Sequence, residues 1–251
     1  MKLIVLDGNL GNSFQDGQPV LSKISERMPA TLWLTGTALL ISILLAVPIG
    51  IYSALKKYSV FDFFFTGLSY FGISIPTFFL GIVSILIFSY WLDWVPPSGM
   101  RDNFERFDPL DRIIHVILPA SVLAIGLIAS KSRYLRNSML EVMNQDFIST
   151  ARAKGLHERK VVLKHAFRNA LLPIITVVTL QLPILFGGAF IIEQIFAWPG
   201  IGRMAINAVF RRDFPIIIGT TMVSAVSVVL FNLFADVLYY LVDPRIRFEK
   251  N

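Results

Sequence analysis

Few side chains in this 251-residue chain could carry out covalent chemistry, and their positions do not predict a reaction centre. Ser74 offers a hydroxyl nucleophile, which needs a histidine within hydrogen-bond reach. His115 begins another apolar segment, whereas His157 and His165 lie in a basic segment, so none is expected at the depth of Ser74. Three scattered histidines and the absence of cysteine also argue against a metal site. We therefore do not expect an enzyme.

The sequence also lacks the motif by which ATPases bind ATP. The chain contains no G-x-x-x-x-G-K-[ST] loop, whose backbone amides would cradle the phosphates of a nucleotide. We therefore expect no cofactor in this chain, and any step driven by ATP must depend on separate subunits.

The composition is that of a membrane protein. Hydrophobic residues make up 55% of the chain, charged residues only 16%, and the mean hydropathy is +0.64. Soluble domains carry about 25% charged residues. The net charge is +6, but in a membrane protein Lys and Arg mark the cytoplasmic side. The composition therefore indicates that the chain lies in a lipid bilayer. Its positive net charge gives no reason to expect nucleic acid as a partner.

Five apolar segments are long enough to cross a bilayer, which takes about 20 residues of helix. Their residues do not alternate between apolar and polar, as barrel strands would. The sequence therefore predicts an all-α polytopic membrane protein, with an extracellular N-terminal segment at 1–30 and a transmembrane domain at 31–250. The predicted spans are 31–55, 64–91, 113–130, 170–196 and 216–242.

The orientation follows from the basic residues in alternate connections. Fourteen Lys and Arg lie in one set, which comprises Lys56–Lys57, residues 131–168 and the tail after Pro244; the other set holds nine. The positive-inside rule then places 131–168 and the C-terminus in the cytoplasm and the N-terminus outside. The apolar run at Leu3–Leu6 is too short for a signal peptide. Either the short tail crosses with the first span, or a helix upstream of Met1 is absent from this sequence.

The segment 131–168 is the one large cytoplasmic connection, and its pattern predicts more than a loop. Asp146 is a candidate helix N-cap. Gly155 fits the position after a helix where φ is positive, and Leu156 fits the apolar contact that accompanies such a cap. A short helix, a glycine turn and a re-entry helix would form a compact docking element. The alternative is a basic loop that touches anionic lipid.

The stretch TARAKGL, followed by HAFRNALLP, resembles the cytoplasmic signature of permease subunits in ATP-binding-cassette importers, in the dipeptide/oligopeptide/nickel branch. The general signature has an acidic–Ala–Ala triplet, then Gly, then Leu-Pro. Here the triplet is Ser149–Thr150–Ala151, and Gly155 and Leu172–Pro173 follow. Ser149 replaces the acidic residue and the spacing is longer, as in the peptide branch. Three more stretches agree with it: GNSF at 11–14, WPGIG at 198–202 and DVLYYLVDPRIR at 236–247.

The resemblance implies the type I fold of importer permeases, with the family's first helix missing from this sequence. It implies a coupling helix that sits in a cleft of the ATPase. The partners it implies are two ATPase subunits that bind ATP and Mg, a second homologous permease subunit and an extracellular or periplasmic substrate-binding protein. The coupling positions carried over are Ala151, Arg152, Lys154, Gly155 and Leu156.

The function indicated is import of di- or oligopeptides across the cytoplasmic membrane. The same type of importer for nickel chelates or oligosaccharides stays open as an alternative. A self-sufficient secondary transporter, from another class, would be expected to show inverted repeats or intramembrane charge pairs. Neither is recognisable in the sequence.

Residues along the path of the cargo are predicted from polar groups and glycines inside the spans, since polar groups avoid lipid. The alternative for each of them is helix packing through small residues or a hydroxyl bonded to the backbone. These positions are Ser74, Thr77, Gln181, Gly187, Gly188 and Asn232.

The outer segment 197–214 is a candidate surface for docking the binding protein, through Trp198, Pro199, Gly200 and Arg211. A rigid turn at the membrane interface is the alternative for this segment. Glu193, just before it, is expected either to cap or be solvated, or to contact the cargo.

Overall fold

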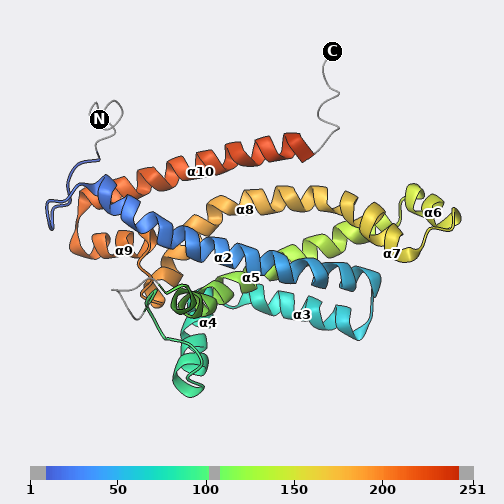
Figure 1. Ribbon diagram of the computed structural model, residues 1–251, viewed down its shortest axis with the longest axis horizontal. Coiled ribbons are helices and arrows are strands. Elements are labelled where there is room, and N and C mark those ends of the chain that lie inside the picture. Colours follow the sequence, from blue (N-terminus) through green and yellow to red (C-terminus); the bar gives the residue numbers. More distant parts are fainter. Residues whose placement is uncertain (1–9, 102–107, 243–251) are drawn as a thin grey trace, which may run out of the picture. The chain divides into compact units, whose positions relative to one another are not determined.

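The chain is helical, as the sequence predicts (Figure 1). This computed structural model describes residues 10–101 and 108–242, without the side chains of 172–174, 176–177, 180–188, 235–236 and 238–242. The helices are α2 (Val20–Leu55), α3 (Val60–Ser74), α4 (Thr77–Ser84), α5 (Pro109–Met143), α6 (Asp146–Ala153), α7 (Glu158–Lys160), α8 (Phe167–Ile195), α9 (Ile201–Arg211) and α10 (Phe214–Val242), with π-helical stretches η1 (Ile85–Trp91) and η2 (Val161–Ala166).

Three helices among the described residues are long and apolar enough to cross a membrane: α2, α5 and the Phe214–Phe234 part of α10. The predicted spans 31–55 and 113–130 lie inside the first two of these. Helix α2 starts at Val20 and runs without a break past the predicted boundary at residue 30. Helix α5 continues past its apolar part to Met143, so it is longer than the predicted span 113–130.

The predicted span 64–91 is not one helix. Helix α3 ends at Ser74, and Ile75 and Pro76 both have extended backbones, with ψ of 127° and 132°. Proline has no N–H to donate and forces the preceding residue out of the helical region, so the break occurs at Pro76. The single predicted helix is therefore corrected to α3 and the continuous pair α4 and η1.

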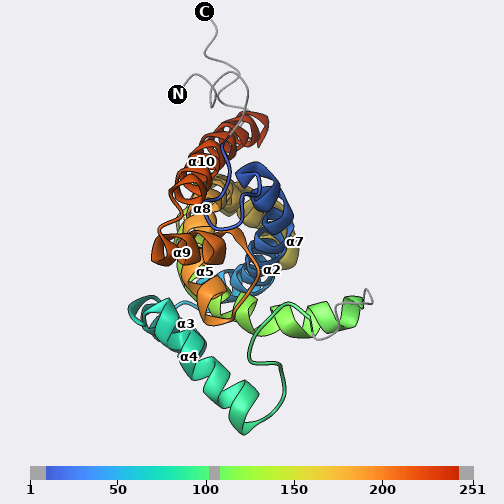
Figure 2. The same ribbon diagram turned by 90° about the vertical axis from the view of Figure 1, so that its left-hand side faces the viewer.

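The chain divides into two compact units. The first unit comprises Met1–Leu39, Pro76–Leu123 and Pro183–Leu230. Its packed cluster joins the start of α2, α9 and the start of α10, which lie together in Figures 1 and 2. Val20 and Ile24 of α2 are buried there against Ile201 of α9 and Ile216 of α10.

The second unit comprises Leu40–Ile75, Ala124–Leu182 and Phe231–Asn251. Its core gathers buried side chains from the end of α2, α5, α6, η2 and the start of α8. Gly50 of α2 lets α5 approach closely, because a Cβ there would lie 2.8 Å from the Cβ of Leu135. Small residues allow such contacts between membrane helices.

A buried ion pair fastens α3 to α5 within the second unit. The guanidinium of Arg136 donates to both carboxylate oxygens of Asp62, at 2.6 and 2.7 Å. Asp62 is 2% exposed and also accepts the backbone N–H of Tyr58 at 2.9 Å. A bidentate guanidinium–carboxylate pair fixes geometry as well as charge, so this pair sets how α3 lies against α5.

Candidate functional site

The first candidate site is the short helix α6 with the turn that follows it. Gln145, with extended backbone angles, is the N-cap, and its side chain makes no capping hydrogen bond. Asp146 is therefore the first helical residue and not the cap, which corrects the sequence prediction by one position. A carboxylate in the first turn still favours the helix through the helix dipole.

The end of α6 has the predicted glycine turn. Gly155 has φ of +74°, a conformation that costs little only without a Cβ. The N–H of Leu156 donates to the carbonyl of Ala151 at 3.3 Å, and the N–H of Gly155 donates to that of Arg152 at 2.9 Å. These two bonds define a Schellman motif. The chain therefore turns sharply at Gly155 and continues through α7 and η2 to α8.

The five predicted coupling residues divide into two groups. Ala151 is 7% exposed and Leu156 is half-buried, and both pack in the core of the second unit beside the fully buried Ile148. Arg152 is exposed, as are Lys154 and Gly155. The first group anchors α6 to the rest of its unit, and the second lies on the surface that a partner can reach.

An exposed ion pair ties α6 to α7. Arg152 donates to Glu158 at 2.7 Å, and this bond holds the pKa of the Glu158 carboxyl below its usual range. Both side chains remain largely exposed, so the pair holds the position of the turn and adds little stability.

Phe147 is the accessible apolar residue of α6, and it was not among the predicted coupling residues. It is 40% exposed, whereas its neighbour Ile148 is fully buried. The signal was present in the sequence: Ile148 and Ala151, spaced i and i+3, share the inward face, which leaves Phe147 and Thr150 on the outward face.

The second candidate site lies in the first unit, where a buried carboxylate organises the start of α9. Glu193 is 0% exposed and accepts the hydroxyl of Thr31 at 2.6 Å and the backbone N–H of Arg203 at 3.0 Å. The Thr31 hydroxyl oxygen in turn accepts the N–H of Ile201 at 2.9 Å. The free N–H groups at the start of α9 are thereby satisfied, and Glu193 acts as a cap.

The WPGIG stretch owes its glycines to close approach. A Cβ on Gly200 would lie 2.2 Å from the carboxylate of Glu193, and one on Gly202 would lie 2.3 Å from the ring of Phe190. The Trp198 indole N–H donates to the Ala30 carbonyl at 2.8 Å, and this side chain is 0% exposed. The stretch therefore forms a rigid buried connection.

Burial separates the four predicted docking residues. Trp198 and Gly200 are buried inside the first unit, so neither presents its side chain or Cα to a partner. Pro199 is half-buried and Arg211 is exposed. Trp198 and Gly200 therefore fit the alternative of a rigid turn that the sequence analysis gave for this segment. For Pro199 and Arg211 the docking role stays a prediction.

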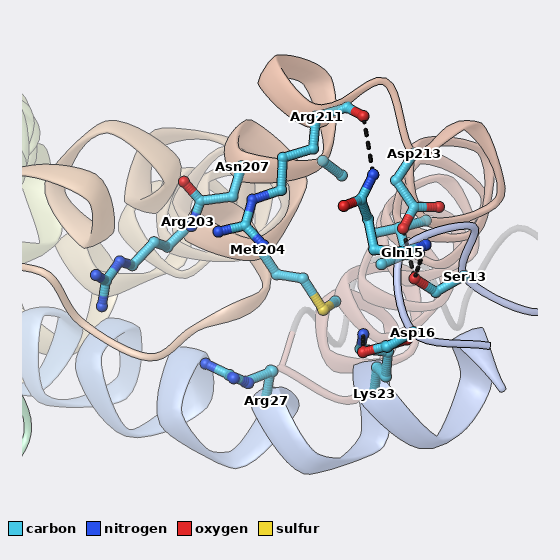
Figure 3. A pocket seen from close by; sticks show the side chains of 12 residues that line it. Ser13, Gln15, Asp16, Lys23, Arg27, Arg203, Met204, Asn207, Arg211 and Asp213 are labelled. Carbon is cyan, nitrogen blue, oxygen red and sulfur yellow. Dashed lines mark hydrogen bonds and ion pairs between the residues drawn. The ribbon is translucent and has the colours of Figure 1, made fainter. Parts of the chain in front are cut away.

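A polar pocket of about 340 Å³ lies beside α9 (Figure 3). Its wall is built by the loop that contains the GNSF stretch. Ser13 donates its hydroxyl to Asp213, and the N–H of Phe14 donates to the same carboxylate at 3.1 Å. Burial alone would raise the pKa of Asp213, but these hydrogen bonds hold it below its usual value. The loop is thereby fixed against the end of α9.

Basic side chains dominate the rest of the pocket wall. Arg203 and Arg211 come from α9 and Arg27 from α2, and Figure 3 shows these helices on opposite sides of the pocket. Lys23 pairs with Asp16. Among the residues that the structure describes, the guanidinium groups of Arg27 and Arg211 have no hydrogen-bond or ion-pair partner. They are available to an anionic group such as a carboxylate.

Three of the six predicted pathway residues, Ser74, Thr77 and Asn232, are among the side chains that the structure describes. The Ser74 hydroxyl donates to the carbonyl of Tyr70 at 2.8 Å, which is the backbone bond of the packing alternative. Thr77 and Asn232 are exposed. The remaining three, Gln181, Gly187 and Gly188, lie on α8 outside the residues whose side chains the structure describes.

Related proteins share both sequence and arrangement with this chain. The curated proteins include the oligopeptide transport system permease protein AppB of Bacillus subtilis (strain 168), 44% identical over 245 residues, which are 97% of this chain and 78% of AppB. The dipeptide transport system permease protein DppB of Escherichia coli (strain K12) is 38% identical over 267 residues, covering 98% of this chain and 79% of DppB.

Solved structures show the same fold at low identity. A chain of the MetNI methionine ABC transporter in an inward-facing conformation superposes with a TM-score of 0.71 at 16% identity, covering 89% of this chain and 97% of that one. The model of the family described as binding-protein-dependent transport system inner membrane component matches residues 46–248. The chain therefore has the fold of ABC importer permeases and belongs to this family of multi-pass inner membrane components of transport systems.

Proposed function

We propose that this chain is a permease subunit of an ATP-driven importer that moves di- or oligopeptides across the cytoplasmic membrane. The observation that carries the proposal is the α6 turn, which comprises α6 and the turn at Gly155 and Leu156. Its inner face packs in the core of the second unit, and its outer face is exposed. The relatives named as oligopeptide and dipeptide permeases support the peptide as cargo.

The α6 turn would transmit the movement of a separate ATPase. Ala151 and Leu156 join α6 to α5 and α8 through the core of the second unit, so a push on α6 moves these helices with it. Phe147, Lys154 and the backbone at Gly155 would contact the ATPase. Apart from Gly155 itself and its two chain neighbours, no described atom lies within 4 Å of a Cβ placed there, which leaves room for the partner.

The polar pocket of the first unit would receive the substrate-binding protein. Arg27 and Arg211 are unpaired within the described part of the chain, and the loop from Ser13 holds α9 in place, so acidic side chains on a partner would find cationic positions beside a fixed helix. Charge complementarity of this kind raises the rate and specificity of docking more than the affinity.

The complete importer in this proposal contains this chain, a second homologous permease, two ATPases that bind ATP and Mg, and the binding protein. The segment 131–168 and the C-terminus would then face the cytoplasm, where the ATPases act, and the pocket would face outward. The chain itself would bind no cofactor.

Reconstitution in proteoliposomes tests the function. We expect uptake of a labelled di- or oligopeptide only when the binding protein, both permeases, both ATPases and ATP are present. Uptake that continues without ATP or the ATPases would favour the secondary transporter. Uptake of a nickel chelate or an oligosaccharide in place of every peptide tested would keep the importer and replace the cargo.

A further inference from the structure

Lys131 is a buried cation that the proposed function does not use. It lies on α5 and is 2% exposed, and its Nζ has no hydrogen-bond partner in the described part of the chain. Removing an ammonium group from water without a partner is costly. An ionisable group buried inside a membrane protein is retained where it has a counterpart to bind.

A cavity of about 210 Å³ adjoins Lys131 within the second unit. Helix α2 contributes Ile43 and Val47 to its wall, and α8 contributes Ile175 and Val178. The other polar side chain of the lining, Thr179, already donates its hydroxyl to the carbonyl of Ile175 at 2.7 Å. The cavity thus combines one cation with an aliphatic lining.

We propose that this cavity holds the C-terminal end of the peptide cargo, with the terminal carboxylate on the ammonium of Lys131 and an aliphatic last side chain against the apolar wall. The inference rests on the proposed function and assigns a subsite to it. A carboxylate supplies the single negative charge that Lys131 lacks, and an aliphatic side chain needs no hydrogen bonds from its surroundings. Sites for small ligands commonly combine apolar walls with a few polar anchors.

Two other anions fit the cavity less well. A lipid phosphate is normally bound by clusters of basic side chains, whereas Lys131 is the one basic residue among the lining residues that the structure describes, and its side chain is buried. A carboxylate from the second permease would match the charge but would leave the aliphatic space next to Lys131 unexplained. The combination of one cation and apolar volume favours the peptide terminus.

The test compares one dipeptide in two forms, Ala-Leu with a free carboxylate and Ala-Leu with a C-terminal amide. Both are offered to the reconstituted importer with the wild-type chain, with Lys131→Met and with Lys57→Met. Methionine keeps the length and apolar stem of lysine, and Lys57 is an exposed control lysine. The same binding protein serves all three, so its own preference cancels when the ratio of acid to amide uptake is compared between chains.

We expect Lys131→Met to lower the ratio of acid to amide uptake about tenfold or more, since the variant loses a charge-assisted hydrogen bond, and Lys57→Met to leave it unchanged. An equal fall of both forms, an unchanged ratio, or a fall that follows only the anionic lipid content of the vesicles would overturn the proposal.

A second measurement covers the case in which the amide is not transported. Millimolar Ala-Leu should raise the thermal midpoint of the purified permease pair with Lys131 and not with Lys131→Met. Equal stabilisation of both would overturn the proposal. A wild-type importer that transports no peptide would instead remove the proposed function and this subsite with it, whereas peptide uptake with an unchanged ratio removes the subsite alone.

Discussion

Replacing Gly155 by valine is the sharpest perturbation of the α6 turn. Its φ of +74° lies in the left-handed region, which costs a residue with a Cβ about 1–2 kcal/mol and a β-branched one more. If the turn opens instead, the Leu156 and Gly155 N–H bonds that close it are lost, at about 1 kcal/mol each. Either route costs about 2 kcal/mol.

A cost of about 2 kcal/mol lowers the population of the intact turn roughly thirtyfold relative to alternatives. The change is confined to the turn, because apart from the two chain neighbours no described atom lies within 4 Å of the new Cβ, so the Cβ displaces nothing in the core. We therefore expect Gly155→Val to insert in the membrane normally and to pack its core normally.

The assay is ATP hydrolysis stimulated by the binding protein and peptide, measured beside peptide uptake in proteoliposomes. Gly155→Val should lower both by about tenfold or more, and Gly155→Asn is the matched control because asparagine tolerates positive φ. Retained activity in the asparagine variant would show that the turn itself matters; its loss would show that the partner needs the open space. Wild-type coupling in Gly155→Val would refute the role of α6.

Three further predictions concern the two candidate sites. Gly200→Ala places a methyl group 2.2 Å from the buried carboxylate of Glu193 and should lower stability by about 1–3 kcal/mol, seen as a lower thermal midpoint in detergent, whereas an unchanged midpoint would contradict the packing. Phe147→Ala should leave insertion intact and weaken retention of the ATPases in co-purification by about 1–2 kcal/mol; undiminished retention would exclude Phe147 from the contact. The pKa of Asp213 lies below its ordinary value of 3.8, so its contribution to stability is complete above that value and disappears as the pH falls through the lower, folded pKa. Asp213→Asn should therefore destabilise the chain at pH 7, and its difference from wild type should shrink as the pH falls below 3.8; a difference that stays constant in acid would count against the carboxylate.

Local signals in the sequence predicted the helices and the glycine turn well. The apolar runs inside α2 and α5 follow directly from hydropathy, and the positive φ at Gly155 follows from a glycine placed after a short helical pattern. The predicted span 64–91 contains Pro76, yet the run on both sides of this proline was apolar enough to suggest one span. Hydropathy measures burial in lipid and carries no information on where the backbone breaks.

Contacts between distant segments could not be predicted in the same way. Thr31 and Glu193 are 162 positions apart, and Asp62 and Arg136 are 74 apart. Neither pair leaves a spacing that a single sequence reveals. Trp198 illustrates the consequence: its indole is buried and donates to the carbonyl of Ala30, 168 positions away, and no local pattern indicates this contact.

Gly155 and Gly200 are both glycines of a candidate site, but the structure favours glycine at the two positions for different reasons. Gly200 has no room for a side chain, because the Glu193 carboxylate occupies the space beside it; its role is internal, and a partner cannot reach it. Gly155 has open space around it and a positive φ that favours glycine and tolerates asparagine; its role concerns the turn and any partner that approaches from outside. Asparagine should therefore substitute at Gly155 but not at Gly200. Of these two glycines, only Gly155 lies on a surface that a partner can reach.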